Sequence, residues 1–267
     1  MACLELLPAE AAAPRRIVSI NACADQLILA LADREQILAL THYARDPDMS
    51  FYADRAEGLP TIRGDAEEVL KLKPDLVLAG SFTRSATRAQ LAAQSIRIVT
   101  FSPARSIEDV KKHIREVASL VGQETRGDTL VAEIDAAFAN LRPSSRPLRA
   151  LQLQRRAFAA GTDTLIHDIM QRLGIVNAAT DLGIRYVGRT SLEAVLKAKP
   201  DVLILDSADP GAVDQGVALL SHPALEELVP RHRRIVIPSS QIVCASPGIA
   251  LAARTLRDAA ERILDEK

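Results

Sequence analysis

Arginine, aromatic and amide side chains stand directly after several short apolar segments of this sequence. Such segments are typical of strands in a parallel sheet, and open α/β sheets bind ligands beyond the carboxyl ends of their strands. We therefore expect a ligand site built from residues that follow the strands and from two that precede repeated helices. The plain alternative is that surface loops carry polar residues without any role in binding. The candidates are Asn21, Cys23, Tyr43, Arg63, Phe82, Arg84, Arg155, Phe158, Tyr186 and Gln241, and a wider set adds His42, Ser81, Gln154, Asp206, Ser207 and Cys244.

The expected ligand is anionic or carries carboxylates. Arg63, Arg84 and Arg155 all fall at predicted site positions, and a guanidinium group binds carboxylate or phosphate through two parallel hydrogen bonds. Aromatic residues make up only 3% of the chain and there is no Trp, so few stacking surfaces are available to a ligand.

Motifs for catalysis are missing from the sequence. It contains no G-x-S-x-G nucleophile elbow, no P-loop and no G-x-G-x-x-G turn. Cys23 is placed where a helix N-terminus would favour its thiolate, but no His–Asp pair stands near it in the sequence. We expect a protein that is not an enzyme and has no cofactor. The second hypothesis is a cytoplasmic α/β enzyme that uses a cleft between two lobes for catalysis.

The five histidines do not form a metal site by spacing. None of them is separated from another His, a Cys or a carboxylate by a sequence spacing typical of metal ligands. A bound metal ion needs three or four such ligands. We expect structural or solvent roles for them, so that any metal arrives inside a chelate. The five are His42, His113, His167, His222 and His232.

Charge and cysteine content limit the class of protein further. The 33 basic and 34 acidic residues give a net charge of -1, which does not favour a nucleic-acid partner. The longest apolar runs are too short for a membrane-spanning helix. Three cysteines are too few for a disulfide scaffold. Cys23 and Cys244 both fall at predicted cleft positions. A disulfide between them would need an oxidising compartment and Cα atoms close enough to be bridged, and the sequence does not determine that distance.

Strand-like and helical segments alternate along the chain, which predicts an α/β fold. A long helix at residues 125–141 interrupts this alternation. A proline-containing loop at 143–147 follows it, so the helix would connect two α/β halves. The predicted strands are residues 17–20, 37–40, 76–79, 96–101, 150–153, 202–205 and 235–237. The predicted shorter helices are residues 25–32, 67–72, 87–93, 107–120, 168–173 and 193–198.

The two halves share a repeated segment. Residues 65–78 read DAEEVLKLKPDLVL and residues 191–204 read SLEAVLKAKPDVLI, with seven of fourteen positions identical. Each copy predicts a short helix, a Lys-Pro-Asp turn and a buried strand, because the residue before a proline leaves the helical conformation. Glu67 and Glu193 occupy the same place in the first turn of each helix, where a carboxylate interacts favourably with the helix dipole.

These features together resemble the helical-backbone solute-binding proteins of ABC importers, which carry cobalamin, ferric siderophores or haem. The resemblance rests on PRRIVSINACADQLILALAD near the start, the two E-x-V-L-x-x-K-P-D segments and ASPGIALAARTL at residues 245–256, and it covers residues 15–263. It implies two α/β lobes joined by one long helix, with the ligand between the lobes and little hinge motion. The chain departs from the cobalamin binders of this family, which use several Trp and Tyr residues in the cleft.

The resemblance also implies a partner and a location. Members capture a metal chelate outside the cytoplasm, in the periplasm or on an anchor, and deliver it to a permease of two subunits. One carboxylate on each lobe, Glu67 and Glu193, would dock on that permease dimer through charge-assisted hydrogen bonds. We expect a monomer. The predicted lobes are residues 15–123 and 143–267, with the connecting helix at 124–142. Residues 1–14 are either the remnant of an export signal or a leader, because they end in small residues but lack a basic start.

Overall fold

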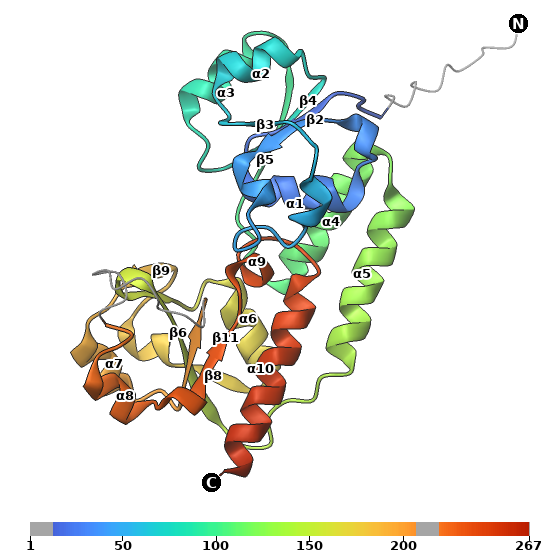
Figure 1. Ribbon diagram of the computed structural model, residues 1–267. Coiled ribbons are helices and arrows are strands. Elements are labelled where there is room, and N and C mark those ends of the chain that lie inside the picture. Colours follow the sequence, from blue (N-terminus) through green and yellow to red (C-terminus); the bar gives the residue numbers. More distant parts are fainter. Residues whose placement is uncertain (1–12, 207–218, 267) are drawn as a thin grey trace, which may run out of the picture.

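The computed structural model describes residues 13–206 and 219–266, which form two β-sheets in two lobes (Figure 1). The first sheet has the strand order β3-β2-β1-β4-β5, and each neighbouring pair in it is parallel. The predicted strands of this half are confirmed, and the two-residue β3 was not predicted. The strands are β1 (Ile17–Ser19), β2 (Ile37–Thr41), β3 (Thr61–Ile62), β4 (Leu76–Gly80) and β5 (Arg97–Phe101).

Helices cover both faces of the first sheet, which explains why its strands are apolar throughout. Along β4, Leu76 and Leu78 join the core beneath α1 and α4, whereas Val77 and Ala79 join a second core beneath α2 and α3. Successive side chains of a strand point to opposite faces, so both sets must be apolar. The helices are α1 (Ala22–Leu31), α2 (Ala66–Leu72), α3 (Ser85–Ala92) and α4 (Ile107–Val121).

The second sheet has the strand order β11-β10-β6-β7-β9, and β8 pairs with the first half of β6. Its strands are β6 (Leu148–Gln154), β7 (Phe158–Ala160), β8 (Ile175–Asn177), β9 (Val187–Arg189), β10 (Val202–Leu205) and β11 (Arg234–Val236). The helices around it are α6 (Leu165–Arg172), α7 (Leu192–Ala198), the unpredicted α8 (Pro223–Leu228) and α9 (Ser239–Ile242), and α10 (Gly248–Asp265).

The three strands predicted for this half correspond to β6, β10 and β11 and are parallel, as expected. Strands β7, β8 and β9 were not predicted, and β7 and β9 make the sheet mixed. Strand β7 runs antiparallel to β6, and β9 runs antiparallel to β7. The chain reverses between β6 and β7 at Arg156 and Ala157, which both have φ near 59°. Turns with positive φ are usually marked by Gly or Asn, and neither stands here. The hairpin therefore gave no signal in the sequence.

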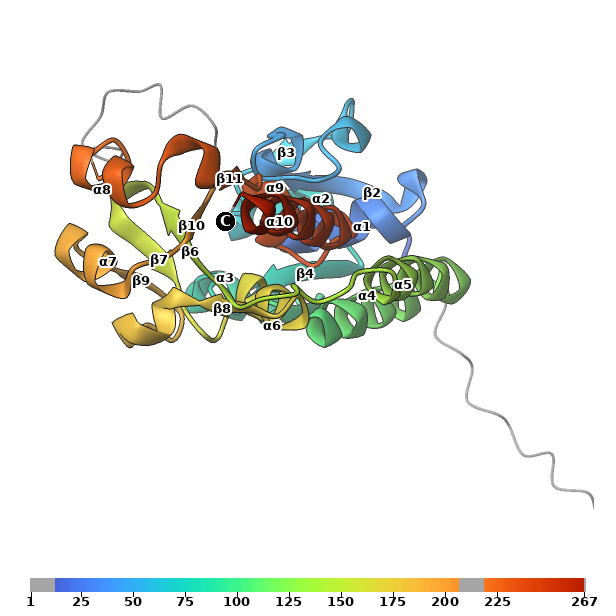
Figure 2. The ribbon, with the colours of Figure 1, turned by 90° about the horizontal axis from the view of Figure 1, so that it is seen from below.

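The lobes are connected by α5 (Glu124–Ala139), as predicted from the long apolar pattern at residues 125–141. This helix packs against α4, and α10 lies beside it along the same side of the molecule (Figures 1 and 2). One continuous core contains Ile114 of α4, Ile134 of α5, Ile169 of α6 and Leu256 of α10. The connection is therefore a packed group of helices and not a single free helix. The predicted limits of the lobes stay predictions.

The loop from α5 to β6 is held at several points. Arg257 on α10 donates from Nε to the carbonyl of Arg142, and Arg146 donates from Nη2 to the carbonyl of Leu264. The amide of Ser144 donates to the carbonyl of Leu173 over 2.8 Å. Hinges normally use loop residues that are free to change their backbone angles, and these contacts restrict the best-placed loop.

The repeat of α2 and α7 extends to backbone conformation. Both helices end on a left-handed lysine, Lys73 with φ of 48° and Lys199 with φ of 47°. An arginine at each strand start donates to the helix end: Arg16 Nε to the carbonyl of Lys73 over 2.9 Å, and Arg149 Nη2 to that of Ala198 over 2.8 Å. Cations near a helix C-terminus complement the helix dipole. The Lys-Pro-Asp turn is therefore stabilised in the same way in both lobes.

Candidate functional site

A cavity of about 650 Å³ lies between the two lobes. It is formed where the predicted strand ends meet, after β4 and β5 in the first lobe and around β6, β7 and β9 in the second. Most of its lining is apolar, as is usual for small-molecule sites. The first lobe contributes Phe82, Pro103, Ala104 and Arg105, and the second contributes Gln152, Gln154, Ala160, Asp163, Thr164, Leu165, Ile166, Tyr186, Val187, Ile242 and Val243.

Arg105 connects the lobes across this cavity. Its Nη1 donates to the hydroxyl of Tyr186 over 3.2 Å, and its guanidinium carbon lies 4.6 Å from the centroid of the Tyr186 ring. The same nitrogen lies 3.7 Å from Oδ2 of Asp163, which also accepts from Arg185 over 3.0 Å. Among the described lining residues, the only carboxylate and the only guanidinium are therefore paired with each other.

Phe82 offers an apolar surface to the cavity. Its side chain is 87% exposed, although it follows directly on the buried strand β4. The ring is therefore available as an apolar contact surface for a ligand in the cavity.

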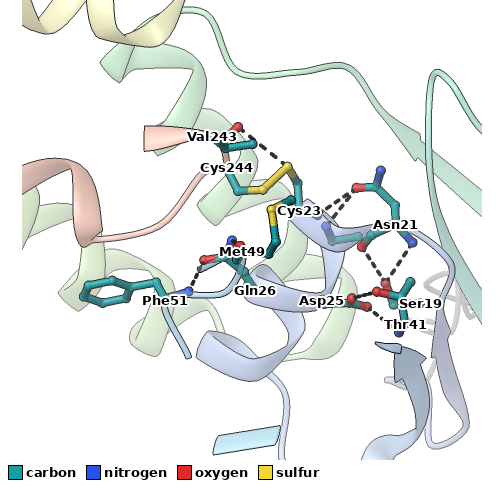
Figure 3. Close-up of a disulfide and its surroundings, with 11 residues drawn as sticks. Ser19, Asn21, Cys23, Asp25, Gln26, Thr41, Met49, Phe51, Val243 and Cys244 are labelled. Atoms are coloured by element: carbon teal, nitrogen blue, oxygen red, sulfur yellow. Dashed lines mark hydrogen bonds between the residues drawn. A yellow bond between two sulfur atoms is a disulfide. The ribbon is translucent and has the colours of Figure 1, made fainter. Parts of the chain in front are cut away.

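A disulfide joins the lobes beside the cavity (Figure 3). Cys23 on α1 and Cys244, between α9 and α10, have Cα atoms 4.9 Å apart. The preceding residue, Val243, lines the cavity, and its carbonyl oxygen lies 3.7 Å from Cys23 Sγ. Asn21 caps α1 by accepting from the amides of Cys23 and Ala24, each over 3.1 Å. Cys23 is thus no free nucleophile, and the bridge that the sequence left open is present.

A buried carboxylate, that of Asp25, stands two residues beyond Cys23 on α1 (Figure 3). Asp25 is fully buried, accepts from the amide of Thr41 over 3.2 Å and also accepts from the Thr41 hydroxyl. Burial raises the pKa of Asp25 to about 6, although hydrogen bonds from Ser19 and Thr41 lower it in part. Asp25 does not line the interlobe cavity, and its hydrogen bonds from Thr41 join α1 to β2.

We expect Asp25 to make stability fall as pH rises from about 4 to about 7. The folded chain holds the proton more tightly than the unfolded chain, so stability is highest below about pH 4 and is lost as pH rises through the folded pKa of about 6. Two pKa units correspond to about 3 kcal/mol. Chemical denaturation of the wild type and of Asp25→Asn at several pH values checks this, since the other carboxylates cancel in the difference. Parallel pH profiles for the two proteins would contradict it.

The cavity brings together only some of the residues selected from the sequence. Phe82, Tyr186 and Gln154 line it, and Asn21, Cys23 and Ser81 line a small adjoining cavity of about 40 Å³. Gln241 directly precedes Ile242, and its buried Oε1 has no hydrogen-bond partner among the described residues. Ser207 lies outside the described residues, as do residues 1–12 of the proposed leader. Tyr43, Arg63, Arg84, Arg155 and Phe158 are not among the lining residues of either cavity, and their part in binding stays a prediction.

Each of those five has other surroundings. The ring of Tyr43 contacts that of His42 in a tilted arrangement with centroids 3.9 Å apart, and the ring of Phe158 lies 5.9 Å from the guanidinium carbon of Arg189. The amide of Arg63 donates to Glu68, while Arg84 is an exposed cap of α3. Arg155 is exposed at the turn after β6. A part for the three arginines in ligand binding stays a prediction.

Several cavity residues were missed in the sequence. Pro103, Ala104 and Arg105 follow β5, so the rule that selected the other strand ends also points to them. Gln152 stands inside the apolar segment of β6, where the alternation ALQLQ was its only signal. Asp163 lies 58 residues along the chain from Arg105 and nothing local relates the two.

Within residues 13–206 and 219–266, no three His, Cys, Asp or Glu side chains are grouped closely enough to hold a metal ion. Over the same ranges, no helix combines the length and apolar character that crossing a bilayer requires.

The two repeated glutamates are both exposed on short helices. Glu67 follows the first residue of α2 and pairs with Lys71 over 2.8 Å. Glu193 has the same place in α7, whose cap Ser191 accepts from the amide of Ala194 over 3.2 Å. Figure 1 shows α2 in the first lobe and α7 in the second, so each lobe presents one such carboxylate.

Comparison with known proteins gives consistent matches. The model of a family described as periplasmic binding protein matches residues 17–231. The cobalamin-binding protein of Halobacterium salinarum is 27% identical over 72% of this chain and 53% of its own length, so the chain spans about half of that relative. The vitamin B12-binding protein of Pectobacterium carotovorum is 26% identical over 76% of this chain and 75% of its own. The apo structure of the periplasmic heme-binding protein of Roseiflexus sp. RS-1 has a TM-score of 0.71 and 26% identity, covering 92% of this chain and 99% of its own.

Proposed function

This chain belongs to the periplasmic binding protein family, and from that premise we propose that it captures a metal chelate between its lobes and delivers it to an ABC import permease. It is a binding protein and not an enzyme, which sets aside the alternative of a cytoplasmic enzyme. The ligand in this proposal is cobalamin, a ferric siderophore or haem. The observation that carries it is the cavity of about 650 Å³ with mostly apolar walls, placed where both lobes contribute residues.

The disulfide supports a location outside the cytoplasm. Cys23 and Cys244 are bridged, and such bridges form and persist in oxidising compartments such as the periplasm. The proposed location is therefore the periplasm, in agreement with the names of the similar proteins.

Delivery requires contact with the permease, for which we assign Glu67 and Glu193. Both are exposed, and neither lines either of the two cavities at the lobe boundary. A two-lobed protein that meets two permease subunits needs one anchor on each lobe. Carboxylates at matching positions can accept charge-assisted hydrogen bonds from arginines of the two subunits.

Titration calorimetry with cyanocobalamin, haem and a ferric hydroxamate tests the proposal. We expect at least one of these chelates to bind with a dissociation constant in the micromolar range or below. The corresponding free metal ions should not bind, because no three His, Cys, Asp or Glu side chains of the described residues are grouped closely enough to hold one. Native mass spectrometry of the protein purified from its own host should show the same chelate retained. Failure of all three chelates to bind would contradict the proposed function.

A further inference from the structure

We propose that Gln152 and Gln154 select a neutral chelate whose edge carries primary amides, as a corrinoid does, over one whose edge carries carboxylates. This inference rests on the function proposed above and names the chemistry of its ligand. It starts from the geometry of β6. The two glutamines are two residues apart on one strand, so their side chains leave the same face of the sheet, and both line the interlobe cavity.

The amide groups of these glutamines are available for a ligand. Gln152 is only 3% exposed and Gln154 is half-buried, yet among the described residues neither side chain takes part in a hydrogen bond. Neither amide is fully enclosed, because none of its nitrogen or oxygen atoms is among the buried side-chain atoms that lack a hydrogen-bond partner. Both amides can therefore exchange contact with solvent for hydrogen bonds to a ligand, so a ligand that satisfies both donor and acceptor should gain affinity and a fixed orientation at these two positions.

The charge of the cavity argues against a carboxylate partner. Arg105, the one guanidinium among the described lining residues, lies 3.7 Å from Asp163 and donates to Tyr186, while Arg185 adds a second contact to Asp163. A ligand carboxylate would thus be taken out of water without a cation of its own, which is strongly unfavourable. The three arginines that favoured an anionic ligand in the sequence do not line the cavity, so that expectation has no support here.

A primary amide fits the two glutamines in a way that a carboxylate does not. Gln offers a carbonyl acceptor and an NH₂ donor, so it can form two reciprocal hydrogen bonds with another amide. A carboxylate only accepts, which leaves each Gln carbonyl without a donor. The apolar walls formed by Pro103, Leu165 and Val243 suit the flat face of a macrocycle whose amides project from its edge.

A matched pair of corrinoids separates these possibilities. Dicyanocobinamide carries amides around the ring, and dicyanocobyrinic acid has carboxylates in the same places. Calorimetry at pH 7.5 with both, and with haem and a ferric hydroxamate, should give at least tenfold tighter binding of the amide form. The variant Gln152→Leu/Gln154→Leu should lose tenfold to a hundredfold in affinity for dicyanocobinamide and little for the acid. Gln171→Leu, an exposed change on α6, is the control and should bind as the wild type does.

The possible results of these binding measurements distinguish failure of the amide selection from failure of the proposed function. Equal or tighter binding of the carboxylate form, or an unchanged affinity in a double variant whose circular dichroism and melting match the wild type, overturns the inference. If haem or the hydroxamate binds and neither corrinoid does, the amide selection is wrong while the binding function stands. If no chelate binds, the proposed function fails with it.

Discussion

Replacing Glu67 and Glu193 together with glutamine is expected to abolish stimulation of the transporter ATPase, while chelate affinity and melting temperature stay nearly unchanged. Hydrogen bonds to charged groups contribute about 1.5–3 kcal/mol each. Loss of the charge at both anchors should therefore weaken docking by roughly 10²- to 10⁴-fold. ATPase assays with the permease in reconstituted membranes measure the effect, and calorimetry measures chelate binding.

The Glu67→Gln/Glu193→Gln change is expected to lower the stability of the folded protein only slightly. Glu67 pairs with Lys71, but the glutamate side chain is 82% exposed, and exposed pairs contribute little to stability. A carboxylate in the first turn of a helix contributes about 0.3–1 kcal/mol through the dipole. Glutamine also keeps the shape of each side chain. A large fall in melting temperature would therefore indicate an unforeseen structural role.

A control with the same change in charge separates docking from general electrostatics. Glu116 on α4 and Asp128 on α5 are both exposed, on the helices of the connection and away from α7 (Figures 1 and 2). Glu116→Gln with Asp128→Asn should leave transport intact. If the Glu67→Gln/Glu193→Gln protein drives transport normally, the docking assignment is wrong and the repeat of α2 and α7 serves only the fold.

The architecture could be predicted because its signals are local. In β4, four successive apolar residues, Leu76 to Ala79, require cover on both faces, and the structure provides it. The repeat at residues 65–78 and 191–204 marked two equivalent helices, which end on left-handed lysines with nearly equal φ. Apolar periodicity and proline position determine such elements without reference to the rest of the chain.

The candidate site depended on contacts that no local pattern contains. Arg105 meets Tyr186 across 81 residues of sequence, and the disulfide joins positions 221 residues apart. The residue types and strand ends indicated where Phe82 and Tyr186 would lie. They did not indicate which arginine would face the cavity, because an arginine at the end of a strand does not always line it: Arg105 does, whereas Arg84 and Arg155 do not.

Removing the Cys23–Cys244 bridge is expected to lower stability by about 2–5 kcal/mol, or roughly 5–15 °C in melting temperature. The bridge closes a loop with a sequence separation of 221 residues, and the entropy that a crosslink removes from the unfolded chain increases with loop length. Thermal unfolding of Cys23→Ser/Cys244→Ser by circular dichroism measures the loss. The double variant and the bridged reference protein should both carry Cys3→Ser, so that the third cysteine cannot exchange with the pair.

The lobes should nevertheless stay together without the bridge. The amide of Ile107 donates to Asp168 across the lobe boundary over 2.8 Å, and Arg172 pairs with Glu108 over 3.1 Å. The loop from α5 to β6 is held by Arg257 and Arg146. Small-angle scattering should therefore give a radius of gyration for the variant within about one ångström of the wild type. An increase of several ångströms would show that the disulfide alone prevents opening.

Chelate affinity provides the second measurement on the same variant. Val243 lines the cavity and is followed directly by Cys244, so release of the bridge frees one wall of the site to move. Ordering that wall again on binding costs conformational entropy, and we expect affinity to fall by less than tenfold. A reductant should lower the melting temperature and affinity of the bridged protein to the values of the variant, and should leave the variant unaffected. A bridged protein that melts and binds identically with and without reductant would show that the bond contributes to neither property.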